Sequence, residues 1–206
     1  MDLASIKSTF RIKNRQFSYF SLKKFASLGF ENSTTLPFSI KVLLESALRN
    51  FDNYKVTEKL ITTIAGWSAY AEEKKEIVFM PGRVILQDFT GVPCIVDLAA
   101  MRDGMKALGG DDQKINPKVP CDLVIDHSVQ TDFYGSKNAF AKNLKKEFQR
   151  NYERYEFLKW GQNTFKNFRV IPPATGIIHQ INLEYLAQGV LVCHLNGEHV
   201  VYPDSL

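Results

Sequence analysis

Short apolar runs alternate with longer amphipathic stretches along this 206-residue chain, and the alternation limits the folds that it can adopt. Runs of strand length occupy residues 83–88, 123–125 and 168–171, and residues with helical spacing of apolar side chains lie between them. Strands that alternate with helices build parallel sheets covered by helices. The sequence therefore predicts an α/β fold, layered α/β/α with a mostly parallel sheet.

Capping residues and turn residues predict the remaining elements. The helix over residues 37–51 is amphipathic, and Asn196-Gly197 is a strong hairpin signal between strands over 189–195 and 198–202. We expect an N-terminal arm and short helix in residues 1–35, and one α/β domain in residues 36–206. The other expected elements are an extended arm over 10–20, a helix over 21–28, a helix over 55–71 interrupted near Gly66, a strand over 76–79, a helix from Pro93 to Gly109-Gly110, a helix over 136–165 and a helix over 181–187.

Composition and cysteine spacing exclude several classes of protein. A hydrophobic share of 45% is enough for a folded core, and a net charge of +4 does not by itself indicate nucleic-acid binding. Cys94, Cys121 and Cys193 are far apart and form no C-x-x-C pair, which indicates free thiols in a reducing compartment. We find no secretory signal and no membrane-spanning run, so we expect a cytoplasmic protein with no membrane partner.

Polar residues follow three of the apolar runs, as Gln87-Asp88, Asp126-His127 and His179-Gln180. Because parallel strands end at the same edge of a sheet, we expect these residues to meet there. They offer two imidazoles for proton transfer, a carboxylate to charge one of them, and an amide to hold a substrate oxygen. Asp126 and His127 can touch only if the backbone leaves strand geometry between them, since successive strand side chains point to opposite faces.

Other catalytic motifs are absent from the sequence. It contains no G-x-S-x-G elbow, no phosphate loop and no G-x-G-x-x-G fingerprint, so acyl transfer, kinase chemistry and dinucleotide binding lack support. His194 and His199 flank the predicted hairpin, and we interpret them as surface or structural residues.

Specific segments resemble the aconitate hydratase family. They include LPFSIKVLLESALRN, RVILQDFTGVPCIVDLAAMRDGMKALGGD, INPKVPCDLVIDHSVQTDFYG and the stretch EFQRNYERYEFLKWGQNTFKNFRVIPPATGIIHQINLEYLA. The resemblance runs from about residue 10 to the last residue. It is closest to the bacterial A-type branch, which also includes the cytosolic iron-regulatory proteins, and it covers the N-terminal part of those proteins. It implies the fold of the first aconitase domain.

The resemblance also implies an activity and roles for four residues. Members of the family are lyases of the tricarboxylic acid cycle that interconvert citrate and isocitrate through cis-aconitate, with a [4Fe-4S] cluster that acts as a Lewis acid. By resemblance, Gln87 in LQDFTG binds substrate. His127, charged by Asp126 in VIDHS, would protonate the departing hydroxyl, and His179 in GIIHQ would belong to the hydrogen-bonded shell around the iron-bound oxygens.

Several parts of the family pattern are missing from these 206 residues. The cluster cysteines, the general-base serine and the substrate-binding arginines lie further along the family's chain, and none of the three cysteines here matches a cluster ligand. We therefore expect no metal ligand in this chain and no activity from it alone. A truncation, a pseudogene product and part of a split enzyme that binds the missing C-terminal part all fit this pattern.

Two alternative functions also fit the sequence. An iron-sulfur 2-methylcitrate dehydratase differs from aconitate hydratase in pocket residues outside this segment. A module that binds RNA or a protein partner, as in the iron-regulatory branch, would use the basic stretch 137–166. This stretch contains eight Lys and Arg and only three Glu.

Overall fold

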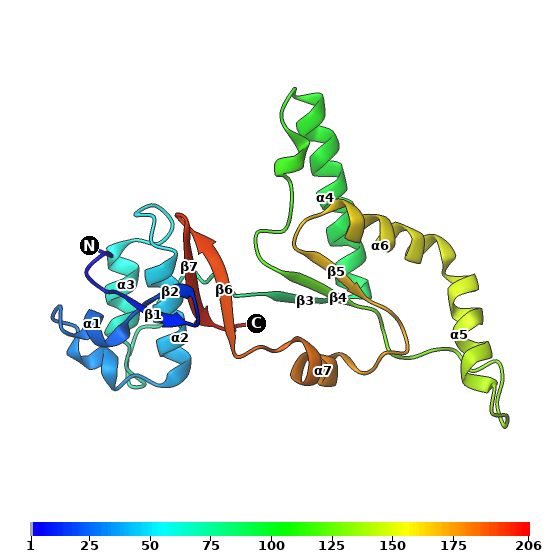
Figure 1. Ribbon diagram of the computed structural model, residues 1–206, viewed down its shortest axis with the longest axis horizontal. Helices are drawn as coiled ribbons and strands as arrows, with labels where there is room; N and C mark the ends of the chain where they lie inside the picture. Colours follow the sequence, from blue (N-terminus) through cyan, green and yellow to red (C-terminus); the bar gives the residue numbers. More distant parts are fainter. Residues whose placement is uncertain (1) are drawn as a thin grey trace. The chain divides into compact units, whose positions relative to one another are not determined.

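The computed structural model describes residues 2–206 and consists of two compact units (Figure 1). The first unit joins the residues up to Gly82 with Gln188–Ser205, and the second is the continuous segment Arg83–Ala187. The second unit is thus inserted into the sequence of the first. Contacts divide the chain at these points and not at residue 35, where we expected the N-terminal arm to end.

The first unit contains a mixed sheet of four strands in the order β1-β2-β7-β6. Two antiparallel hairpins, β1–β2 and β6–β7, join along a parallel β2–β7 contact at Ser18 and Val200. Its elements are β1 (Lys7–Ile12), β2 (Arg15–Phe20), α1 (Leu22–Ala26), the 3-10 helix η1 (Glu31–Thr34), α2 (Phe38–Arg49), α3 (Glu58–Ala65), β6 (Val190–Leu195) and β7 (Glu198–Pro203).

A single apolar cluster holds the first unit together. Leu44 and Leu48 of α2, Ile61 of α3 and Val200 of β7 are completely buried in it. Helix α3 begins at a capped residue: the Thr57 hydroxyl accepts the Leu60 N–H at 3.2 Å, whereas α2 begins after Pro37 without a side-chain cap. The cluster therefore joins N-terminal helices to a strand near residue 200.

The second unit is built on a parallel sheet of three strands in the order β3-β4-β5. Each strand is short, with only four residues between a loop and the following turn or helix. Its elements are β3 (Val84–Gln87), α4 (Asp88–Ala107), the 3-10 helix η2 (Asp112–Lys114), β4 (Cys121–Val124), α5 (Ala139–Arg150), α6 (Tyr152–Thr164), β5 (Phe168–Ile171), α7 (Ile178–Ile181) and the π-helical turn η3 (Asn182–Leu186).

Alternation of side chains along β4 buries both faces of this sheet. Leu123 packs with Ile95 of α4 and Leu158 of α6, whereas Val124 packs on the other face with Ile181 and Leu186. Figure 1 accordingly shows α4 and α6 on one side of the strands and α7 on the other. The predicted α/β/α layering with a parallel sheet is confirmed in this unit.

Several predicted elements agree with the structure. The helix over 37–51 is α2, the strand over 168–171 is β5, and the hairpin turns at Asn196 and Gly197, whose φ angles of 51° and 82° both lie in the left-handed region. Positive φ at both central residues is the mark of a type I′ turn, which matches the twist of the flanking strands.

Other predicted elements were wrong. Residues 10–20 do not form an extended arm but belong to the β1–β2 hairpin, which turns at Lys13 with a φ of 52°. Residues 76–79 form no strand, and the expected helix over 55–71 does not resume after Gly66, since residues 67–71 are not helical. Helix α4 begins at Asp88, five residues ahead of Pro93, so Pro93 lies inside the helix, where it has no N–H to donate to the Phe89 carbonyl.

The long basic helix expected over residues 136–165 is two helices. Asn151 separates α5 from α6 with φ and ψ of −110° and 28°, which are not helical angles. Apolar side chains of the two helices are therefore buried unequally: Leu158 of α6 is 1% exposed, whereas Phe140 of α5 is 67% exposed.

Among residues 2–206, no helix combines the length and the apolar character needed to cross a membrane.

Candidate functional site

The three parallel strands end side by side. Gln87 of β3 lies opposite Val124 of β4, and Val124 lies opposite Ile171 of β5. Beyond these residues the chain enters helix α4, the Asp126-His127 segment and the turn that leads to α7. The polar residues that follow the strands thus lie beyond the same edge of the sheet. Open α/β sheets bind their ligands at this edge.

A pocket of about 160 Å³ lies at this edge. Gln87, Asp126 and His127 line it, so three of the four residues singled out from the sequence come together. His179 does not line it, but Ile177 and Ile178, the two residues before it, do. Its full lining is Gln87, Asp88, Phe89, Val124, Ile125, Asp126, His127, Ile177 and Ile178.

The Asp126 and His127 side chains meet because the backbone turns after β4. The strand ends at Val124, and Oδ1 of Asp126 accepts the Ser128 N–H at 2.6 Å, which closes a tight side-chain turn. The same Oδ1 lies 3.6 Å from Nδ1 of His127. Successive side chains therefore lie side by side here, which strand geometry would prevent.

The electrostatics of this pair favour a charged carboxylate. The pKa of Asp126 lies below its usual value, chiefly because the Ser128 N–H donates to the carboxylate, and in smaller part because His127 is close. Asp126 lies at the Nδ1 side of the imidazole, so Nε2 is the ring nitrogen that can meet a substrate. The two side chains are 57% and 49% exposed, so a small molecule can reach them.

Asp88 is a residue of the pocket that the sequence pattern placed beside Gln87 but to which it gave no role. Its side chain is only 7% exposed, and its Oδ1 accepts the backbone N–H of Asp126 at 2.9 Å. The only signal for it in the sequence is its position directly after Gln87, at the end of an apolar run.

The residues present do not fit an iron-sulfur cluster. Among residues 2–206, no group of three or more His, Cys, Asp or Glu is placed to hold a metal ion. Cys193 lies on β6 of the first unit, whereas Cys94 and Cys121 belong to the second. Burial raises the pKa of Cys121 to about 11, so this thiol stays protonated at neutral pH and is a poor metal ligand.

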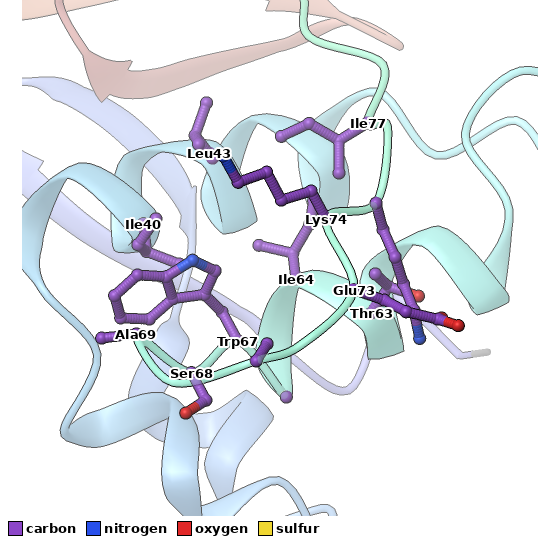
Figure 2. A pocket seen from close by; sticks show the side chains of 13 residues that line it. Ile40, Leu43, Thr63, Ile64, Trp67, Ser68, Ala69, Glu73, Lys74 and Ile77 are labelled. Carbon is purple, nitrogen blue, oxygen red and sulfur yellow. The ribbon is translucent and has the colours of Figure 1, made fainter.

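A second cavity, of about 470 Å³, lies in the first unit between α2, α3 and the segment that follows α3. Figure 2 shows its apolar wall, with Ile40, Leu43 and Ile64 facing the indole of Trp67, and the chain of Lys74 reaching across it. Its lining contains no histidine and none of the residues singled out from the sequence. The cavity therefore lacks the acid–base groups that mark the smaller pocket.

The basic stretch 137–166 is less charged than its sequence indicates. Arg150 pairs with Asp132, and Arg154 pairs with Asp88 at 3.0 Å, so carboxylates outside the stretch neutralise two of its cations. This pairing gives the RNA-binding interpretation no further support.

The fold and the pocket together define a class of protein. The site consists of a carboxylate–imidazole pair and an amide, and it lies at the carboxyl edge of the sheet in a three-layer α/β unit. Such a site suits a protein that transfers a proton to a polar small molecule.

Comparison with known proteins narrows this class to one family. The sequence profile of the aconitase family (aconitate hydratase) matches residues 57–205, and the chain belongs to this family. It is 56% identical over 194 residues to aconitate hydratase A of Francisella tularensis subsp. holarctica (strain LVS), covering 94% of this chain. It is 52% identical over 201 residues to that of Escherichia coli (strain K12), and 48% over 205 residues to that of Bacillus subtilis (strain 168), covering 97% and 100% of this chain. The chain spans only 21–23% of the length of these relatives.

Proposed function

We propose that this chain forms the N-terminal wall of the active site of an aconitate hydratase, a lyase that interconverts citrate and isocitrate through cis-aconitate. The observation that carries the proposal is the meeting of Gln87, Asp126 and His127 in one pocket at the ends of β3 and β4. The pocket volume of about 160 Å³ is smaller than the roughly 300–1,000 Å³ of ligand pockets, so further groups would have to enclose a tricarboxylate.

Each residue of the pocket has a role in this proposal. His127, whose Nδ1 lies 3.6 Å from Oδ1 of Asp126, donates a proton to the hydroxyl that leaves citrate or isocitrate. The Gln87 amide binds a substrate oxygen and fixes the orientation of the reacting carbon. His179, which follows the two isoleucines of the pocket wall, hydrogen-bonds to further substrate oxygens.

The complete enzyme requires groups beyond these residues. In this family a [4Fe-4S] cluster supplies Lewis-acid activation of the substrate hydroxyl, and we propose that its ligands and the general base come from the part of the protein that relatives have beyond this match. That part is then the partner of this chain, whether covalently linked or separate. We propose the cytoplasm as the compartment, because Cys94, Cys121 and Cys193 are all free thiols.

A chimera tests the proposal. The chain is joined to the remaining part of the Francisella tularensis relative, reconstituted with iron and sulfide, and assayed for hydration of cis-aconitate by its ultraviolet absorbance. We expect an active chimera, and we expect the His127→Gln variant to lower kcat by roughly 10²- to 10⁴-fold, the contribution of a general acid. His194→Gln is the matched control, since His194 lies on β6 and outside the pocket.

Two results would contradict the proposal. One is a chimera that folds and carries the cluster as the relative does but has no hydratase activity. The other is a His127→Gln variant with the parent rate. Comparison of citrate with 2-methylcitrate in the same assay identifies the substrate, and the chain alone should be inactive after the same reconstitution.

A further inference from the structure

The Asp88 carboxylate links the ends of two neighbouring strands of the sheet in the second unit. Asp88 is the first residue of α4, directly after β3, and its Oδ1 accepts the N–H of Asp126, just beyond β4, at 2.9 Å. The side chain is 7% exposed and lies at the N-terminus of α4. A carboxylate that is almost fully buried thus holds the backbone of the proposed catalytic aspartate.

Arg154 of α6 binds the other oxygen of the same carboxylate. Its Nη1 donates to Oδ2 of Asp88 at 3.0 Å. The two oxygens of Asp88 therefore have different partners, one on α6 and one after β4. A carboxylate that is held at both oxygens cannot rotate without breaking a charge-assisted hydrogen bond.

Neighbouring groups in turn fix the guanidinium of Arg154. Nη2 donates to the Tyr155 hydroxyl at 3.0 Å and lies 3.6 Å from Oε1 of Glu147 on α5. The Tyr155 hydroxyl donates to the same Oε1 at 2.5 Å, and Asn151 donates to it at 2.7 Å. Burial raises the pKa of Tyr155 to about 12, so its hydroxyl keeps its proton at neutral pH.

The end of β3 explains why this link matters. The sheet pairs Gln87 with Val124, and the chain then enters helix α4, so no further residue of β3 lies beside Asp126. Its N–H needs another acceptor, and the Asp88 side chain provides it. With its N–H held there, Asp126 directs its Oδ1 both to the Ser128 N–H and toward Nδ1 of His127.

We propose that Asp88 and Arg154 are positioning residues: the Asp88 carboxylate, anchored by Arg154, holds the turn that places the Asp126 carboxylate beside His127. In this proposal both residues act through Asp126 and not on the reacting atoms. Their importance for catalysis rests on the proposed function, whereas their effect on the turn is a property of this chain alone.

Amide hydrogen exchange on the purified chain, followed by NMR, tests the effect on the turn. Asp88→Ala removes the acceptor, and Arg154→Gln removes its anchor while leaving Asp88 in place. Each should accelerate exchange at the Asp126 amide by roughly tenfold to one-hundredfold, the range for a hydrogen bond to a charged group, and should shift the ring nitrogen signals of His127. Arg150→Gln is the matched control, because Arg150 pairs with Asp132 and not with Asp88.

The Ile125 amide is an internal reference for general destabilisation. It donates to the Ile171 carbonyl at 3.1 Å, within the sheet, so a variant that merely weakens the fold accelerates Ile125 and Asp126 alike. The proposal requires the ratio of Asp126 to Ile125 exchange to rise in Asp88→Ala and Arg154→Gln but not in Arg150→Gln. An unchanged ratio in Arg154→Gln overturns it. If Asp88→Ala does not fold, Arg154→Gln decides alone, since the Arg154 side chain is 34% exposed and its loss is the milder change.

The chimera gives the catalytic consequence separately. There, Arg154→Gln should lower kcat by roughly tenfold with little change in KM, and Arg154→Lys, which keeps the charge, should recover part of the rate. If His127→Gln leaves the chimera's rate unchanged, the proposed function fails while the exchange ratio still decides the positioning role.

Discussion

Two glycines of helix α4 should respond in opposite ways to the same substitution. Gly91 is buried against the sheet, whereas Gly104, later in the same helix, is exposed. A Cβ at Gly91 would lie 2.4 Å from Cδ1 and 2.7 Å from Cγ of Leu123, and 3.1 Å from Cβ of Leu86. A Cβ at Gly104 meets nothing within 4 Å.

The expected free energies follow from these distances. In a helix, alanine is favoured over glycine by about 1 kcal/mol, so Gly104→Ala should stabilise the chain by about 0.5–1 kcal/mol. At Gly91 the same gain is opposed by contacts more than about 1 Å shorter than the roughly 3.5–4 Å of normal carbon–carbon packing. Leu123 is 0% exposed, so it has no open space to enter. Overpacking of this kind costs about 1–3 kcal/mol or more, so Gly91→Ala should destabilise by about 1–2 kcal/mol net.

Urea denaturation of the two variants measures the difference. A gap of about 2 kcal/mol between them corresponds to roughly 1 M in the midpoint at the m-values of small proteins. Gly91→Ala combined with Leu123→Val should recover part of the loss, since the shorter side chain lacks the atom closest to the new methyl group. If Gly91→Ala is as stable as Gly104→Ala, the close packing of α4 on β4 is not what fixes this helix, and the reasoning is refuted.

Two further predictions concern buried ionisable groups. Burial raises the pKa of Glu45 above 4.5, against the opposing effect of Arg49, so this residue favours the folded state below about pH 4.5 and loses that contribution as pH rises through its folded pKa. Glu45→Gln should therefore gain stability relative to the parent as pH rises from 4.5 toward neutrality in urea titrations, and a pH-independent difference would contradict this. Cys121, 7% exposed and with a pKa of about 11, should resist alkylation at neutral pH until the chain unfolds, as peptide mapping by mass spectrometry can test. Modification of Cys121 in the folded chain would show that the thiol is accessible.

Local sequence signals predicted the elements whose formation depends on neighbouring residues. The strand at 168–171 and the hairpin at Asn196-Gly197 carry such signals, and both are present. The β1–β2 hairpin was missed because its turn places Lys13, and not a glycine, at positive φ. The break between α5 and α6 was missed because Asn151 is neither proline nor glycine, and only its surroundings make it leave the helix.

The candidate site also contains both residues that the sequence predicted and a contact that it did not. Gln87 and Asp126-His127 follow apolar runs, and parallel pairing of β3 with β4 brings them together as expected. The contact of Asp88 with Arg154 joins residues 66 positions apart, and in the sequence Arg154 is only one of the cations of the basic stretch 137–166. Tertiary packing alone determines such a pair, so no local pattern predicts it.

The order of the two units along the chain has a consequence for folding during synthesis. Arg83–Ala187 is continuous and can fold once it has left the ribosome, but the first unit pairs Ser18 of β2 with Val200 of β7. The exposed edge of β2 must therefore wait for a strand made about 180 residues later, which at roughly 5–20 residues per second is a delay of about ten seconds or more. During that interval the β1–β2 hairpin presents an unpaired edge to other nascent chains, a situation in which chaperones protect against aggregation.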